Sequence, residues 1–149
     1  MQPACIRVRG PREPWLPPAR DQGSPGPGRP LPKVVQRVLQ PFFPDLDLSK
    51  VIVHQGIPEE LKRRAASPNP AAISVGNHIY VEPGYASLLT PSGWRVLIHE
   101  LRHIQQYQRE GPEVMRKYKE AHRKYGYWDN PYERDAYRFE SIVAEKLGL

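Results

Sequence analysis

Proline is distributed very unevenly along this chain, and its distribution limits how much of the chain can form regular structure. Eleven of the 18 prolines lie at or before residue 44 of the 149 residues. Because proline fixes φ and lacks a backbone N–H, this density works against helices and interior strands. The Gly/Ser/Pro-rich stretch 23–30 has the composition of a linker. We therefore expect residues 1–31 to be an extended or disordered arm and residues 32–149 to form one domain.

The positive charge follows the same division. The formal net charge is +6, but the chain through Lys33 holds six basic and two acidic residues, against 16 and 14 in the remainder. The basic excess belongs mostly to the arm, so nucleic acid is not favoured as a partner of the domain. The interleaved basic and acidic residues of 113–128 are typical of a solvated helix face, with a nucleic-acid or anionic-membrane surface as the alternative.

Two absences narrow the class of protein further. The mean hydropathy is −0.65, and no long uncharged apolar run or secretory signal opens the chain. We expect a cytoplasmic protein without a membrane span, with non-classical export left open. Cys5 is the only cysteine, which excludes an internal disulfide framework and a multi-cysteine zinc cluster. A metal site would therefore use His and carboxylate ligands, with a Cys5 thiolate folding back onto the metal as a remote alternative.

Hydrophobic periodicity after Pro32 predicts a series of short elements and an α+β fold. Gly76-Asn77 separates two apolar runs and should supply the positive φ values of a tight hairpin turn. Pro112 and Pro131 suit the first turn of a helix. The predicted elements are a helix over 34–39, strands over 51–53, 73–75 and 78–81, a helix over 58–66, and three further helices, from residue 91 or 92 through 104, over 112–124 and over 131–147.

The first of the three C-terminal helices contains the motif His99-Glu100-Leu101-Arg102-His103. Residues four apart share one helix face, so His99 and His103 can bind one metal ion. Glu100 is rotated by about 100° from His99, where it can take a proton from metal-bound water. The alternative is an amphipathic helix with two structural histidines.

A catalytic zinc site takes three protein ligands and keeps one position for water. The long zinc motif with a third His would need Gly at 106 and His or Asp at 109, but Gln106 and Arg109 stand there. We therefore expect the third ligand in a later helix. Glu133, in the first turn of the helix after Pro131, is the favoured candidate. Its competitors are Asp135, Glu140 and, more remotely, His122.

The segments AISVGNHIYV (72–81) and LIHELRHIQQ (97–106) together resemble the bacterial metallopeptidase-like core domain associated with extracellular contractile injection systems. That family is a reduced zincin of the gluzincin type. The resemblance implies a small sheet or hairpin, an HExxH helix and a C-terminal helical part. It also implies zinc bound by His99, His103 and Glu133, with Glu100 as general base.

Two positions depart from the pattern of that family. Arg102 stands where the family has a small polar residue. Its guanidinium would lie either beside the metal site or in solvent. Tyr137 stands one turn after Glu133, where larger gluzincins have an Asp that orients a metal-bound His. Asp129 or Asp135 would then have to take over that orienting role.

Zincins usually bind an extended peptide along a sheet edge, and the strand over 78–81 is the candidate edge here. His78 and Tyr80 on that strand, and Tyr137 beyond it, are the candidate substrate-binding residues, and Tyr80, Tyr132 and Tyr137 are candidate oxyanion donors. The alternative is a structural hairpin and packing tyrosines.

The sequence thus predicts a small zinc-dependent metallopeptidase acting on a peptide or protein substrate, with Glu100 activating a zinc-bound water. The alternative is a non-catalytic zinc-binding interaction module of a secretion or injection apparatus. A nucleic-acid binder driven by the arm is a third and weaker alternative.

Overall fold

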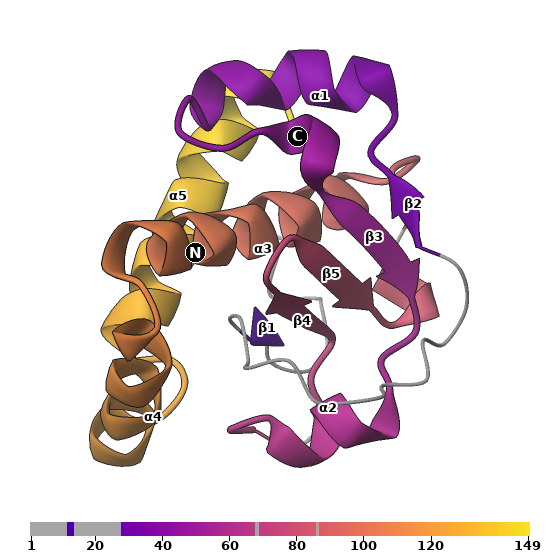
Figure 1. Ribbon diagram of the computed structural model, residues 1–149. Helices are drawn as coiled ribbons and strands as arrows, with labels where there is room; N and C mark the ends of the chain where they lie inside the picture. Colours follow the sequence, from indigo (N-terminus) through magenta and orange to yellow (C-terminus); the bar gives the residue numbers. More distant parts are fainter. Residues whose placement is uncertain (1–11, 14–27, 68, 86) are drawn as a thin grey trace.

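The fold is α+β, with a small sheet packed against a long helix and a helical C-terminal part (Figure 1). The computed structural model describes residues 12–13, 28–67, 69–85 and 87–149. The strands are β1 (Arg12–Glu13), β2 (Arg29–Pro30), β3 (Ile52–Gln55), β4 (Ala72–Val75) and β5 (His78–Val81). The α-helices are α1 (Lys33–Leu39), α2 (Glu59–Arg64), α3 (Pro91–Glu110), α4 (Glu113–Tyr125) and α5 (Pro131–Leu147). Short 3-10 helices lie at Gln40–Phe42, Leu48–Lys50 and Pro83–Tyr85.

The sheet has the order β1-β4-β5-β3-β2. β4 and β5 form the predicted antiparallel hairpin, in which Gly76 takes a φ of 59° and Asn77 does not take a positive φ. β5 also pairs in parallel with β3 on its other side. The prediction that residues 78–81 form a sheet edge is therefore wrong, because both sides of β5 already carry hydrogen-bonded neighbours.

Two short pieces of the predicted arm belong to the sheet. β2 pairs antiparallel with β3, and β1 pairs in parallel with β4. The expected boundary after residue 31 therefore does not mark the limit of the sheet. Residues 1–11 and 14–27 of the predicted arm, including Cys5 and its remote role as a zinc ligand, lie outside the described residues.

The helices agree with the sequence pattern because their start signals are local. Pro91 and Pro131 occupy the first turns of α3 and α5, where a missing N–H breaks no hydrogen bond. Thr90 caps α3 by accepting from the Gly93 N–H, and the Asn130 side chain caps α5 by accepting from the Tyr132 N–H. The Asn130 cap fixes the start of α5 and thereby the position of the carboxylate in its first turn.

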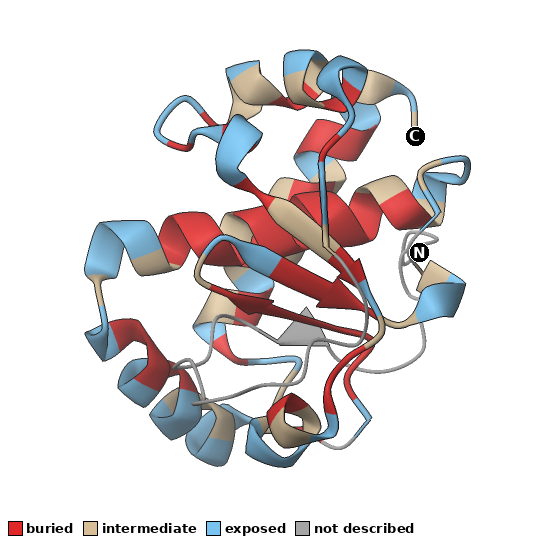
Figure 2. Cartoon of the chain, turned by 45° about the vertical axis from the view of Figure 1, so that its right-hand side comes forward, coloured by how far each residue is buried: buried red, intermediate tan, exposed pale blue. Residues whose placement is uncertain are grey.

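α3 runs through the centre of the molecule and is buried over most of residues 93–106 (Figure 2). One sheet face packs on it through Ile79 and Val81, and α5 packs across it from the other side. Each large apolar side chain buried in this way contributes about 1.5–3 kcal/mol. None of the helices in the described ranges has the length and apolarity needed to cross a membrane.

The opposite sheet face carries a second, smaller apolar cluster that includes Ile73, Tyr80 and, from α4, Met115. Side chains alternate along a strand, so His78 projects on the same face as Tyr80. The ring of His54 stacks on Tyr80 at a centroid distance of 4.4 Å and lies within hydrogen-bond distance of His78. His78 and Tyr80 therefore lie on the sheet face that does not pack on α3.

Candidate metal centre

The HExxH motif lies in the buried middle of α3, so the helix rather than a loop fixes its geometry. The rings of His99 and His103 lie 4.8 Å apart between centroids and are nearly perpendicular. Ligand atoms of His99, Glu100 and His103 all lie within 4.8 Å of one another. His99 and Glu100 are 0% exposed and His103 is 1% exposed. These three side chains could hold a metal ion.

α5 brings a carboxylate to the same point. Glu133 Oε1 lies 2.8 Å from His99 Nε2 and 3.1 Å from His103 Nε2. The other carboxylate oxygen, Oε2, accepts a 2.6 Å hydrogen bond from the Tyr118 hydroxyl of α4. Two imidazoles and one carboxylate oxygen thus converge, and Tyr118 fixes the carboxylate that completes the set.

The separations of Glu133 Oε1 from the two Nε2 atoms suit a small divalent ion. Ligands at about 2.0–2.1 Å from a tetrahedral zinc lie about 3.3 Å from one another. The observed 2.8 and 3.1 Å separations are slightly shorter, so a few tenths of an ångström of expansion would admit the ion. The donor set of two His and one carboxylate is the one that zinc accepts.

A neighbouring amide orients the outer nitrogen of the His103 ring. His103 Nδ1 lies 2.8 Å from Gln106 Oε1, while Gln106 Nε2 donates to the Tyr132 carbonyl at 2.9 Å and to Asp135 Oδ2 at 2.8 Å. Because the Gln106 amide is fixed by its two acceptors, its oxygen faces His103, and Nδ1 must be the donor. This arrangement leaves Nε2 to face Glu133, as a metal ligand requires.

His99 also has a partner at its outer nitrogen, but this partner is a carboxylate and not an amide. Its Nδ1 lies 3.2 Å from Glu140 Oε1, and Glu140 in turn lies beside Arg95, with Nη1 3.5 Å from Oε2. Arg95 is 9% exposed and Glu140 is fully buried. Glu140 is therefore placed to orient His99 through Nδ1, with the guanidinium offsetting its charge.

The carboxylates make the cluster attract positive charge. Burial opposes the charged form of Glu133, but His103 and His99 lower the pKa of Glu133 to about 2. Burial likewise disfavours protonated His103, yet Glu133, with a smaller contribution from Glu100, raises the pKa of His103 to about 9. The metal-free cluster thus binds a proton tightly at the place where a cation would neutralise Glu133.

The other candidates for the third ligand are held elsewhere. The Asp135 carboxylate accepts from Arg102 Nε and Nη2, at 2.8 and 3.0 Å. Arg102 also lies over the Phe139 ring, 4.4 Å from its centroid. The ring of His122 stacks beside Tyr118, at 6.4 Å. Glu133 is the candidate whose carboxylate contacts the Nε2 atoms of both His99 and His103. The Arg102 guanidinium forms an ion pair with Asp135 of α5.

The predicted substrate-binding residues are divided between two regions. The Tyr137 ring packs edge-on against His99, 4.3 Å between centroids, and its hydroxyl lies 2.9 Å from that of Tyr127. Tyr137 thus adjoins the centre, whereas His78 and Tyr80 lie on the far sheet face. Tyr132 directs its hydroxyl to Glu110, which it meets at 3.0 Å.

Sequence reasoning missed two contributors, the orienting amide of Gln106 and the hydroxyl of Tyr118. Gln106 lies three residues after His103, on the same helix face, and this spacing is a signal that could have found it. The sequence carries no comparable signal for Tyr118, which arrives from a separate helix.

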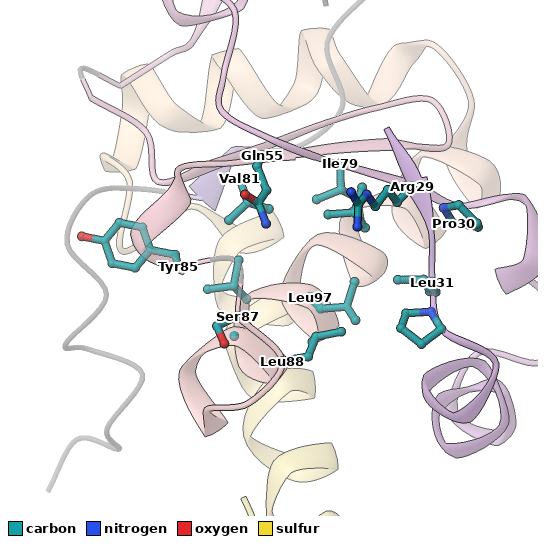
Figure 3. Close-up of a pocket in the computed structure, with 14 residues that line it drawn as sticks. Arg29, Pro30, Leu31, Gln55, Ile79, Val81, Tyr85, Ser87, Leu88 and Leu97 are labelled. Carbon is teal, nitrogen blue, oxygen red and sulfur yellow. The ribbon is translucent and has the colours of Figure 1, made fainter. Parts of the chain in front are cut away.

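A cavity of about 650 Å³ lies elsewhere, between the first turns of α3 and the strands β2, β3 and β5 (Figure 3). Its walls are mainly apolar and include Val53, Ile79 and Leu97, with Arg29 at one side. None of the motif residues lines it. The candidate metal centre and this cavity are therefore separate features of the fold.

Comparison with known proteins supports one part of the resemblance noted for residues 72–106, the association with extracellular contractile injection systems. No curated protein and no solved structure matches the chain. Residues 30–111, more than half of the 149, match the model of the eCIS core domain, named for extracellular contractile injection systems. The match includes all of α3 and ends before α4 and α5, so Tyr118 and Glu133 lie outside it. The chain belongs to the eCIS core domain family.

Proposed function

We propose that this eCIS core domain is a small zinc-dependent peptidase that acts on a peptide or protein substrate. The observation that carries the proposal is the convergence of His99 Nε2 and His103 Nε2 on Glu133 Oε1. Both rings direct Nδ1 outward, to Glu140 and to Gln106. Such an arrangement orients both Nε2 lone pairs toward one point and supports metal binding there.

In this proposal, His99, His103 and Glu133 hold the zinc and Glu100 acts as the general base. When bound, zinc lowers the pKa of water and polarises a carbonyl group. Glu100 follows His99 directly in α3, and its carboxylate lies within the same cluster of ligand atoms. It accepts the proton that the attacking water loses and can pass it to the leaving amine.

A second candidate is a non-catalytic zinc module of an injection apparatus. The observation that favours it is burial, since His99, Glu100 and Glu133 are each fully buried and a structural site needs no open position. In that case zinc would mainly join α3 to α5 and its removal would unfold the chain. The presence of Glu100 beside the two histidines favours catalysis, because a structural site has no use for a base.

Hydrolysis of casein separates the two candidates. Zinc-loaded wild type should cleave the substrate, and Glu100→Gln, brought to the same zinc content, should lose at least about a hundredfold in rate. Glu145→Gln, an exposed change in α5, serves as the control. Equal rates for wild type and Glu100→Gln would refute the mechanism. Absence of cleavage together with zinc-dependent folding would favour the structural module.

A further inference from the structure

Helix α4 covers one side of the candidate metal centre through Tyr118. Tyr118, on the inner face of α4, is fully buried, donates to Glu133 Oε2 and lies edge-on to the His103 ring, 6.4 Å between centroids. The side chain of Asn130 holds the backbone carbonyl of Tyr118 at 3.1 Å. A substrate that approaches Glu133 from this side meets α4 first.

α4 itself is lightly attached to the rest of the molecule. It buries Val114, Met115 and Tyr118, while most of its other residues face solvent. Its ion pairs run within the helix or, from Lys117, to Glu110 at the end of α3. Figure 1 shows α4 projecting beyond the end of α3, at the margin of the fold.

A glycine stands at each end of α4 in a conformation that other residues rarely adopt. Gly111 has φ 77° and ψ −164°, and Gly126 has φ 79° and ψ 179°. This region of φ/ψ space is almost exclusive to glycine. A Cβ added at either position would meet nothing within 4 Å. The two positions therefore demand glycine for backbone conformation and not for space.

We propose that α4 is a lid over the metal centre, hinged at Gly111 and Gly126 and latched by the hydrogen bond from Tyr118 to Glu133. The inference rests on the proposed function, because it explains how a buried zinc site can exchange metal and admit a peptide. Opening breaks two hydrogen bonds, the charge-assisted one from Tyr118 to Glu133 and the one from Asn130 to the Tyr118 carbonyl, and withdraws the three buried side chains of α4. The metal ligands of α3 and α5 stay in place while α4 moves.

The kinetics of zinc exchange test the lid without any assay of peptide cleavage. Zinc loss is followed with excess 4-(2-pyridylazo)resorcinol, and zinc uptake by the metal-free protein with a weak fluorescent zinc indicator. Gly111→Ala and Gly126→Ala strain the closed conformation, so both uptake and loss should accelerate by about fivefold or more. Tyr118→Phe removes the latch and should accelerate both by about tenfold.

Gly148→Ala is the matched control. Gly148 also has a positive φ, of 72°, and open space for a Cβ, but it caps α5 far along the chain from α4. The Gly148→Ala variant should exchange zinc at the wild-type rate even if its free energy of unfolding is lower. Hydrogen exchange adds a second readout, because α4 amides should open more often in Gly126→Ala while α3 and α5 amides behave as in the wild type.

The direction of the rate changes separates a lid from a weakened ligand. A lid variant speeds both uptake and loss, whereas a damaged ligand speeds loss alone. If all variants bind one zinc and the Gly111 and Gly126 variants exchange it within twofold of Gly148→Ala, the lid is refuted and the metal site stands. If the wild type binds no zinc, the metal site is refuted and the lid with it.

Discussion

Glu140 of α5 holds the outer edge of the His99 ring in α3, with Oε1 3.2 Å from Nδ1. The inner edge of the same ring faces Glu133, two helical turns earlier in α5, at 2.8 Å. One helix thus supplies both a candidate ligand and the group that orients another ligand. The orientation of His99 therefore depends on the packing of α5 against α3.

Replacement of Glu140 by Gln should weaken zinc binding about tenfold or more. It also removes the buried carboxylate that pairs with Arg95, so the variant should be less stable than the wild type. The amide keeps a hydrogen-bond acceptor near His99 but removes the charge that makes the ring a stronger ligand. Competition titration with a chelator measures the affinity, and Glu145→Gln in the exposed part of α5 is the control. Equal affinities for the two variants would mean that Glu140 does not orient His99.

Zinc binding should release a proton and strengthen with rising pH. The pKa of His103 is about 9 in the metal-free protein, so His103 is protonated at pH 7, and a zinc ligand must be neutral. The apparent affinity should rise by roughly tenfold per pH unit up to about pH 9. Calorimetry at pH 6.5–8.5, in two buffers of different ionisation enthalpy, measures both quantities. An affinity that is independent of pH, with no proton released, would contradict this prediction.

Gly93→Ala should destabilise the chain although alanine normally favours a helix. A Cβ at Gly93 would overlap the Ser87 carbonyl oxygen, a backbone atom that must move. We expect a loss of about 3 kcal/mol or more in the free energy of unfolding, measured by urea denaturation. Gly84→Ala is the control, because its Cβ would meet nothing within 4 Å. A Gly93→Ala variant as stable as Gly84→Ala would show that this loop yields easily.

Arg102→Met should lower stability without reducing the zinc content. The guanidinium makes a two-point contact with Asp135 and lies over Phe139, so its loss should cost about 1–2 kcal/mol in the free energy of unfolding. Thermal unfolding and elemental zinc analysis measure the two effects. Loss of zinc at unchanged stability would place Arg102 in the metal centre after all.

Much of the fold follows from local signals in the sequence. The helix starts at Pro91 and Pro131 and the hairpin at Gly76 depend on residues close together in the chain, and the sequence predicts them within one residue. The end of α3 is not predicted, because the helix continues to Glu110, six residues beyond the expected end at residue 104. The interior position of β5 in the sheet is not predicted, because it depends on pairing with β3, which is distant in the sequence. Strand order is a non-local property that hydrophobic periodicity does not carry.

The candidate site divides in the same way. The spacing of His99 and His103 is a helical repeat, and Glu133 follows a helix-start signal, so all three could be proposed from the sequence. The contacts of Glu140 and Tyr118 depend on how α5 and α4 pack around α3. Their partners are 41 and 15 residues away along the chain, beyond the reach of any local pattern.

The zinc content of two glutamate variants shows which carboxylate binds the metal beside His99 and His103. The carboxylates of Glu100 and Glu133 both lie close to the two histidines, but only Glu133 is proposed as a ligand. Elemental analysis after zinc loading and dialysis should find about one zinc per chain in wild type and in Glu100→Gln, and much less in Glu133→Gln. Full zinc in Glu133→Gln together with its loss from Glu100→Gln would contradict the proposed centre.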